Sequence, residues 1–346
     1  MAMADPLPGS SSTGVWPLVS VIVPTYNRAT VLPYLMKALA QQAYPSDRIE
    51  LIVVDNASSD DTEAVIQAWA AVLPFRVRFY RKENQGPAVS RNFGAARAVG
   101  EVLAFTDSDC VPRPTWIRSS IGAIAEGAGL VCGPILPRAR AGGPGLLASQ
   151  LSPSTRDDGL YPTANLVLRR QAFNAIGGFN TRFGLYPWGD LVAGEDVDLA
   201  WRLRRFGERP RFVVDAAVDH LATPLTRSQL LLRPIRVQIL PYLLRTIPEL
   251  RRTYLWKGYF VARSRMYFHL AWLGLATAVL LGSWLPLLTV SPWLYYNAIT
   301  QGTSRSLVRN GHLLKAGAWL LLVAYFELLT TTTLAVSSLR NRRLVL

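Results

Sequence analysis

The chain has 346 residues, a formal net charge of +14 at pH 7 and two cysteines, Cys110 and Cys132. Two cysteines without metal-ligand spacing exclude a disulfide framework and a zinc-finger site, and they fit a reducing compartment. The length allows one domain of roughly 200 to 250 residues and a smaller part. A hydrophobic fraction of 50% is high for a soluble enzyme and indicates membrane spans.

Residues 1–17 have neither a basic start nor an apolar core, so they are not a signal peptide, and we expect a disordered leader. From residue 18 onward, short β-rich apolar runs alternate with helical patterns. Strands are predicted at 19–24, 49–54, 77–80 and 102–105, and helices at 30–42, 59–71 and 86–99, with Thr30 and either Ser59 or Asp60 as helix caps. This alternation predicts an α/β fold with a mostly parallel, doubly wound sheet over residues 18–225.

Polar residues gather at the carboxyl ends of three predicted strands, where parallel sheets bind ligands. They are Thr25, Tyr26 and Asn27 after the first strand, Asp55 and Asn56 after the second, and Asp107 and Asp109 after the fourth. A dinucleotide fold would carry a glycine-rich turn after its first strand. The turn here is Pro-Thr-Tyr-Asn-Arg, which argues against a nicotinamide cofactor.

Two acidic clusters carry the chemistry. Asp107 and Asp109 occupy alternate positions of a segment expected to be extended, so both carboxylates should face one side. Glu195 and Asp196 open a predicted helix, where the helix dipole should keep a carboxylate ionised. The apolar stripe of that helix is Leu199, Leu203 and Phe206. A carboxylate pair for a metal diphosphate and a separate carboxylate for taking a proton suit group transfer from a nucleotide-activated donor.

Five segments form an ordered series along the chain. They are Val-Ser-Val-Ile-Val-Pro-Thr-Tyr-Asn-Arg (19–28), Val-Val-Asp-Asn-Ala-Ser-Ser-Asp-Asp-Thr (53–62), Asn-Gln-Gly-Pro-Ala-Val-Ser-Arg-Asn-Phe-Gly (84–94), Thr-Asp-Ser-Asp (106–109) and Gly-Glu-Asp-Val-Asp-Leu (194–199). Together they resemble the motifs of family 2 glycosyltransferases, inverting enzymes with the GT-A fold, of the type anchored in bacterial membranes. A single Asp-x-Asp is unspecific, whereas five motifs in this order are specific.

The resemblance implies a nucleotide-diphospho-sugar donor and a Mg²⁺ or Mn²⁺ ion that neutralises the leaving diphosphate. It gives Asp109 as a direct metal ligand, and Asp107 as a contact to the ribose or to the ion through water. His220 is either a further metal ligand or a structural residue. The donor-binding set is Pro24, Thr25, Tyr26, Asn27, Asp55, Arg91 and Asp107, with Tyr26 on the base, Asp55 on its ring nitrogen and Arg91 on phosphate.

The same resemblance gives Asp196 as the general base, with Glu195 orienting it or the acceptor. Because no second carboxylate stands as a nucleophile, we expect a single in-line displacement that inverts the anomeric centre. Trp188 is a candidate for stacking on an acceptor sugar, or equally for covering the core.

Two differences from related families indicate the class of acceptor. Processive synthases of this superfamily carry a Gln-x-x-Arg-Trp element after the base, and this chain has none, so one sugar per encounter is expected. Polyprenyl-phosphate sugar synthases typically lack the Gly-Glu-Asp helix, because a phosphate acceptor needs no base. A hydroxyl of a lipid-linked or cell-surface glycan is therefore expected, as in polysaccharide biosynthesis. A polyprenyl-phosphate sugar synthase and a non-catalytic, membrane-tethered nucleotide-sugar binding protein are the alternatives.

The last third of the chain carries the membrane signals. Residues 266–346 hold two predicted transmembrane helices, at 268–290 and 316–338, and a basic tail. Glu327 in the second run is expected to be protonated, or turned toward a partner helix or water, and a buried core helix is the alternative for this run. Residues 226–265 form a basic, amphipathic juxtamembrane segment.

The position of the positive charge suggests a multi-pass protein of the cell membrane, with its catalytic domain in the cytoplasm. Nucleic acid is not expected as a partner, because the basic stretch is interleaved with Leu, Ile, Tyr and Trp and no recognition motif accompanies it.

Overall fold

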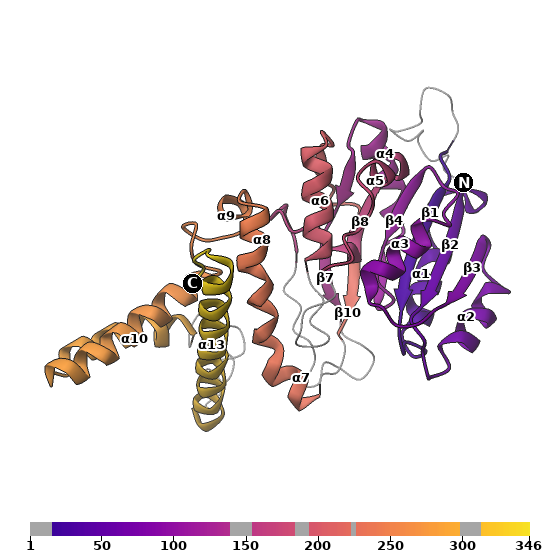
Figure 1. The fold of residues 1–346 in the computed structure, drawn as a ribbon. Coiled ribbons are helices and arrows are strands. Elements are labelled where there is room, and N and C mark those ends of the chain that lie inside the picture. Colours follow the sequence, from indigo (N-terminus) through magenta and orange to yellow (C-terminus); the bar gives the residue numbers. More distant parts are fainter. Residues whose placement is uncertain (1–15, 139–153, 184–193, 223–225, 298–312) are drawn as a thin grey trace, which may run out of the picture. The chain divides into compact units, whose positions relative to one another are not determined.

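The computed structural model describes residues 16–138, 154–183, 194–222, 226–297 and 313–346. It consists of two compact units, Met1–Leu225 and Thr226–Leu346, which are described separately (Figure 1). Residues 1–15, which make up most of the expected leader, and Trp188 lie outside the described residues.

A seven-stranded sheet forms the centre of the first unit (Figure 1). Its strands, in spatial order, are β3 (Arg76–Arg81), β2 (Ile49–Asp55), β1 (Val19–Thr25), β4 (Val102–Phe105), β8 (Leu166–Arg169), β6 (Leu130–Cys132) and β9 (Pro210–Phe212). The first four run parallel, β8 runs antiparallel to both of its neighbours, and β9 is parallel to β6. The predicted α/β fold with a mostly parallel sheet is confirmed.

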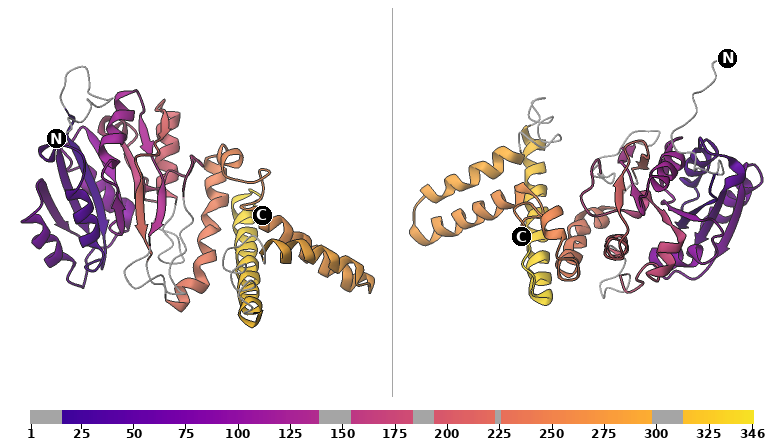
Figure 2. Two further views of the ribbon diagram at one scale, coloured as in Figure 1. Left: turned by 180° about the vertical axis from the view of Figure 1, so that it is seen from behind. Right: turned by 90° about the horizontal axis from the view of Figure 1, so that it is seen from above.

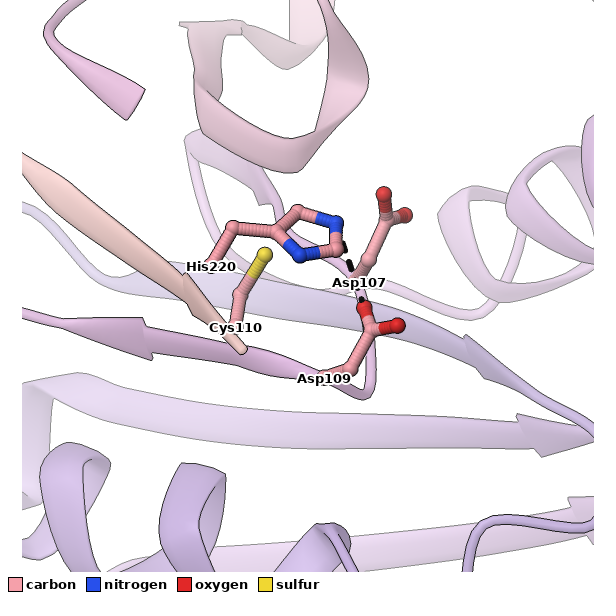
Figure 3. A group of neighbouring side chains, drawn as sticks. All are labelled: Asp107, Asp109, Cys110 and His220. Carbon is pink, nitrogen blue, oxygen red and sulfur yellow. Dashed lines mark ion pairs between the residues drawn. The ribbon is translucent and has the colours of Figure 1, made fainter. Parts of the chain in front are cut away.

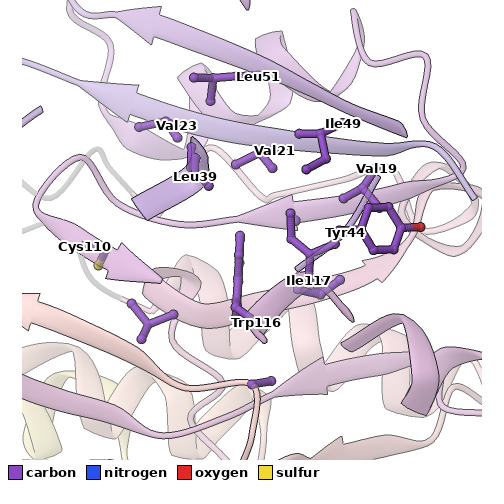
Figure 4. Close-up of a cluster of buried hydrophobic side chains, with 14 of the residues drawn as sticks. Val19, Val21, Val23, Leu39, Tyr44, Ile49, Leu51, Cys110, Trp116 and Ile117 are labelled. Carbon is purple, nitrogen blue, oxygen red and sulfur yellow. The ribbon is translucent and has the colours of Figure 1, made fainter. Parts of the chain in front are cut away.

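Helices cover both faces of this sheet. The elements on one face are α1 (Leu32–Ala40), α2 (Thr62–Ala70) and α4 (Trp116–Ala125), and those on the other are α3 (Pro87–Ala95), α5 (Arg170–Ala175) and α6 (Glu195–Arg205). Successive strand residues point to opposite faces, so Val21 of β1 packs in the first core cluster and Ile22 in the second. Figure 4 shows the first cluster, which includes Val19, Val21 and Val23 of β1 and Trp116 and Ile117 of α4.

A smaller sheet continues from the end of β4. It consists of β5 (Cys110–Pro112), β10 (Val218–Leu221) and β7 (Ile135–Arg138). β10 is antiparallel to β5, with His220 directly opposite Cys110. The Leu221 N–H also donates to the Asp109 carbonyl at 2.9 Å. This sheet therefore places His220 beside the Asp107–Asp109 segment.

The first two predicted helices begin two and three residues later than expected. α1 begins at Leu32 without a side-chain cap from Thr30, and α2 begins at Thr62 with Asp61 at its N-cap. Asp60 still contacts this helix start, because one of its carboxylate oxygens accepts the Thr62 N–H at 3.1 Å. The other oxygen accepts the Ala29 N–H at 3.1 Å and ties the loop after β1 to the loop after β2.

Two further expectations about helices differ from the structure. α3 ends at Ala95, four residues before the predicted end, after the segment in which Gly94 packs on the sheet. A Cβ on Gly94 would lie 2.7 Å from Ile22 Cγ2, so a glycine is required for this close approach. In α6, Leu199 and Leu203 are buried as expected, whereas Phe206 is exposed because it lies beyond the last helical residue, at the C-cap.

The second unit is helical. Its elements are α7 (Arg227–Leu232), η3 (Arg233–Ile239), α8 (Leu240–Thr246), α9 (Leu250–Thr253), α10 (Arg263–Leu281), η4 (Leu285–Val290), α11 (Ser291–Tyr295) and α13 (Leu313–Asn341). Among the described residues, one helix, Gly317–Asn341 within α13, is long and apolar enough to cross a membrane. It contains most of the second predicted span.

The first predicted span, 268–290, is not one helix. α10 ends at Leu281, where Gly282 takes the left-handed conformation at φ 59°. η4 and α11 then fold back against α10, so the apolar run forms a helical hairpin (Figure 2). The hairpin carries exposed apolar side chains at its tip: Val279, Leu280, Leu281, Trp284, Leu285 and Leu288.

Glu327 of α13 pairs with Arg265 of α10. Their side chains are buried, and Arg265 Nη2 lies 2.9 Å from Glu327 Oε2. Of the three expected environments for Glu327, the structure shows the one facing a partner helix.

Candidate active site

Asp107 and Asp109 lie in a turn between β4 and β5. The Cys110 N–H donates to the Asp107 carbonyl at 3.0 Å, so the segment is not extended as predicted. The turn nevertheless brings both carboxylates together with two further side chains. The ligand atoms of Asp107, Asp109, Cys110 and His220 all lie within 4.8 Å of one another (Figure 3).

Two basic side chains from other elements contact Asp109. His220 of β10 places Nε2 3.5 Å from Asp109 Oδ1. Arg28, from the loop after β1, places Nη2 3.6 Å from Asp109 Oδ2. Arg28 was not among the predicted site residues, although it closes the first of the five motifs and follows a strand end, which is the signal that could have identified it.

Arg91 connects the two acidic clusters. It lies on α3, whose first turn begins after Gly86 at φ 85°, and its side chain is only 5% exposed. Nη2 donates to Asp107 Oδ1 at 2.7 Å, and Nη1 donates to Glu195 Oε1 at 3.0 Å. In this structure the guanidinium thus binds two carboxylates, whereas a phosphate contact was predicted.

Glu195 and Asp196 form the first turn of α6, after Gly194 at φ 100°. Glu195 is buried, and its Oε2 has no hydrogen-bond partner among the described residues. A buried carboxylate oxygen of this kind can accept a hydrogen bond from a ligand hydroxyl. Asp196 is half-buried, so a ligand can reach it although the surrounding protein desolvates its carboxyl.

The pKa of Asp196 is raised from 3.8 to about 7. Burial of its carboxyl is the main cause, and the neighbouring charge of Glu195 adds to it, while the Val197 N–H and Arg91 act in the opposite direction. This rise runs against the effect expected from the helix start, because burial disfavours the charged form of the carboxyl. Asp196 can therefore exchange a proton near neutral pH.

Thr25 and Asp55 belong to a third group of predicted site residues. They are the last residues of β1 and β2 and are paired in the sheet. Asp55 is fully buried and accepts the Ser58 N–H at 3.1 Å, so its carboxylate already has a local partner. The buried Thr25 Oγ1 has no partner among the described residues, whereas the Tyr26 side chain is 49% exposed.

The remaining predicted donor residues have structural contacts in this group. Pro24 lies within the buried strand β1. Asn27, at φ 51°, accepts the Ser59 N–H through Oδ1 at 2.8 Å. These contacts fix the loop that carries Tyr26.

Comparison with known proteins agrees with this fold. The model of glycosyl transferase family 2 matches residues 20–184. Glycosyltransferase AglE of Haloferax volcanii is 30% identical over 232 residues, which cover 65% of this chain and 73% of that protein. The pre-mycofactocin glycosyltransferase of Mycobacterium tuberculosis is 28% identical over 215 residues, which cover 58% of this chain and 42% of that protein.

A solved structure shares the fold over most of the chain. The mannosyltransferase PcManGT from Pyrobaculum calidifontis, in complex with GDP-Man and Mn²⁺, has a TM-score of 0.56 at 20% identity, and the match covers 95% of this chain and 90% of that one. The fold and the acidic site define a glycosyltransferase with a GT-A-like architecture. The chain belongs to family 2 of the glycosyltransferases, as its motifs predicted.

Proposed function

We propose that the protein transfers one sugar, with inversion, from a nucleotide-diphospho-sugar to a hydroxyl of a lipid-linked or cell-surface glycan, assisted by Mg²⁺ or Mn²⁺. The observation that carries this proposal is the double ion pair of Arg91. One guanidinium contacts Asp107 on the donor side and Glu195 on the acceptor side, at 2.7 and 3.0 Å. A donor and an acceptor bound at these two clusters would meet in one site.

The residues around Asp109 fit a divalent cation. Two carboxylates and one imidazole offer oxygen and nitrogen ligands of the kind that Mn²⁺ accepts, and the carboxylates also suit Mg²⁺. A bound ion would neutralise the charge that develops on the leaving diphosphate. Arg28, 3.6 Å from Asp109 Oδ2, can add a hydrogen-bonded positive charge to the same phosphates. The structural neighbour PcManGT was solved with GDP-Man and Mn²⁺, and we extend this pairing of ligands to the present chain.

The nucleoside would extend from the metal site toward the ends of β1 and β2. The exposed ring of Tyr26 is available for stacking on the base, and the buried Thr25 Oγ1 has an unused hydrogen-bonding position. Asp55 is the proposed acceptor for the ring nitrogen, sharing its carboxylate with Ser58.

Asp196 is the proposed general base. Its pKa of about 7 matches the condition for efficient proton transfer near neutral pH, since a useful fraction is ionised and the carboxylate is more basic than an ordinary one. Glu195 is held by Arg91 through one oxygen and can orient the acceptor hydroxyl through the other. The proton of the attacking hydroxyl goes to Asp196, and the nucleoside diphosphate leaves with the electrons of the broken glycosidic bond.

We also propose that the second unit attaches the enzyme to a membrane. The helix Gly317–Asn341 has the length and apolarity of a span, and the hairpin tip around Leu280 and Trp284 exposes contiguous apolar side chains that water disfavours. The proposed orientation places the catalytic unit in the cytoplasm. The Val261 N–H donates to the Leu346 carbonyl at 3.0 Å, so the C-terminus lies near the start of α10 and a reporter fused after Leu346 should read cytoplasmic. An external signal would contradict this orientation.

The function can be tested with sugar nucleotides alone. Full-length protein in detergent is screened with UDP- and GDP-sugars for Mn²⁺-dependent protection against thermal unfolding, since a ligand that binds only the folded state raises the melting temperature. The protecting donor is then used to measure release of the nucleoside diphosphate with glycan acceptors. Protection without release under any condition would favour a binding protein over an enzyme. Transfer to a polyprenyl phosphate would favour the synthase.

A further inference from the structure

Cys110 lies in the metal cluster, although neither the sequence pattern nor the proposed transfer reaction gives it a role. Its side chain is fully buried at the start of β5, and Sγ is one of the four ligand atoms that lie within 4.8 Å of one another (Figure 3). Cys132, the other cysteine of the chain, lies on β6 outside this cluster. Cys110 therefore differs from Cys132 in having three metal-binding side chains around it.

The pairing of β5 with β10 explains why the thiol and the imidazole meet. Cys110 and His220 are direct partners in the antiparallel register. Directly opposed residues of antiparallel strands project from the same face of the sheet, with their Cβ atoms about 4.5 to 5.5 Å apart. Asp109 precedes Cys110 in the turn and lies 3.5 Å from His220 Nε2, so both strands converge on the same point.

Sulfur changes which ion this cluster prefers. Carboxylate oxygens suit Mg²⁺ and Mn²⁺, whereas a set with thiolate and imidazole favours softer ions such as Zn²⁺ and Cd²⁺. A tetrahedral zinc site with bonds of about 2.0 to 2.3 Å holds its ligand atoms roughly 3.3 to 3.8 Å apart. The four atoms here lie within 4.8 Å of one another, so closing such a site would require only small changes of side-chain rotamer.

We propose that Asp107, Asp109, Cys110 and His220 form an inhibitory site for a soft divalent ion, Zn²⁺ or Cd²⁺. On binding, the S–H bond of Cys110 breaks, a sulfur–metal bond forms and the proton passes to solvent, with no change of oxidation state. Four protein ligands complete a tetrahedral shell and leave no open position for the donor diphosphate. A six-coordinate Mg²⁺ or Mn²⁺ on the oxygen ligands keeps positions open. The inhibition rests on the proposed function, whereas the thiolate site itself does not.

The site can be tested without sugar donor or acceptor. Metal-free, full-length protein is titrated with Cd²⁺, and the ultraviolet charge-transfer band of the cadmium–thiolate bond is recorded. Because the sequence holds only two cysteines, Cys132→Ala leaves Cys110 as the single thiol, and the band then reports on Cys110 without substitution of that residue. In the wild type and in Cys132→Ala we expect a band whose intensity corresponds to one cadmium-bound thiolate per chain. In Cys110→Ser we expect no band.

Inhibition gives the second readout. Zn²⁺ should inhibit Mn²⁺-supported release of nucleoside diphosphate in the wild type and in Cys132→Ala at concentrations at least about tenfold lower than in Cys110→Ser, because one ligand of the soft-metal site is lost. Absence of the cadmium–thiolate band in Cys132→Ala would overturn the proposal. The proposal would also fall if Zn²⁺ inhibited Cys110→Ser and the wild type at the same concentration. If the protein shows the cadmium–thiolate band but no transferase activity, the metal site stands and only the proposed function is refuted.

Discussion

Arg91 Nη1 lies 3.0 Å from Glu195 Oε1, and this contact joins α3 to the first turn of α6. The same guanidinium reaches Asp107 at 2.7 Å with its other nitrogen. Both contacts are charge-assisted and the arginine itself is buried, so its planar fork fixes the distance between the two acidic clusters.

Replacing Arg91 with Met should lower the free energy of unfolding by about 3 to 5 kcal/mol, because Glu195 would be left as a buried charge without its partner. Arg91→Lys keeps the charge but cannot bridge both carboxylates, so turnover should fall while much of the stability remains. Thermal unfolding and turnover are measured in the full chain. Arg97→Lys, at an exposed arginine that stacks on Phe93, is the matched control and should leave turnover unchanged. Wild-type turnover in Arg91→Lys would show that the bridge has no role in the reaction.

Asp196→Asn should reduce turnover by about 10² to 10⁴ while donor binding is retained, because the substitution removes the proposed base and leaves the metal cluster intact. Nucleoside diphosphate release and donor-dependent thermal protection are the two readouts. Asp198→Asn is the control on the same helix, since Asp198 pairs with Arg202 at 2.7 Å and faces away from the proposed reaction. Equal losses in the two variants would indicate a general defect of the helix.

The pH dependence of kcat/KM should show a rising limb with an apparent pKa near 7. Asp196 acts in its ionised form, and its pKa is raised from 3.8 to about 7, so activity is low below this pH and reaches its plateau above it. A limb near 4 would mean that the pKa of the titrating base is not raised in the working enzyme.

The raised pKa of Asp196 affects stability in the opposite direction to activity, because stability falls as the pH rises. A carboxyl whose pKa is higher in the folded state binds protons more strongly when folded, so its contribution to stability is present below pH 4 and is lost as the pH rises through about 7. Thermal unfolding between pH 5 and pH 8, compared with Asp196→Asn, measures this contribution. The decline over this range should be smaller in the variant.

Asp109→Asn should raise the Mn²⁺ concentration that supports half-maximal activity by at least about tenfold, because a proposed ligand loses its charge. Asp219→Asn is the control on the neighbouring strand, where Asp219 pairs with Arg113 at 3.1 Å outside the cluster. Full activity after treatment with a chelator would contradict the proposed metal dependence.

The Arg265–Glu327 pair should couple α10 to α13. Glu327→Leu leaves a buried arginine unpaired and should lower the melting temperature, whereas the double variant Arg265→Met, Glu327→Leu should recover part of the loss. The melting temperature in detergent is measured for both single variants and the double variant. Additive losses would mean that the two side chains do not interact in solution.

The sequence predicted what depends on local pattern. The strands β1 to β4 follow from short apolar runs, and the acidic clusters follow from their motifs at strand and helix ends. The break of the first apolar run was also readable, because Gly282 and Pro286 interrupt it.

Other features depend on contacts between distant segments. Cys110 and His220 lie opposite each other on two strands of three and four residues. Strands this short carry too little pattern to be recognised in the sequence. The double pairing of Arg91 and the raised pKa of Asp196 both depend on burial in the folded chain. The helix dipole, which a sequence does reveal, favours an ionised Asp196, whereas the desolvation that raises its pKa depends on the fold.

The most direct test of the account is an experimental structure of the full chain with Mn²⁺ and an unreactive analogue of its donor. We expect Mn²⁺ between Asp109 and the diphosphate, with the anomeric carbon turned toward the carboxylate of Asp196. A sugar directed away from α6, or a diphosphate bound without contact to Asp109, would contradict it.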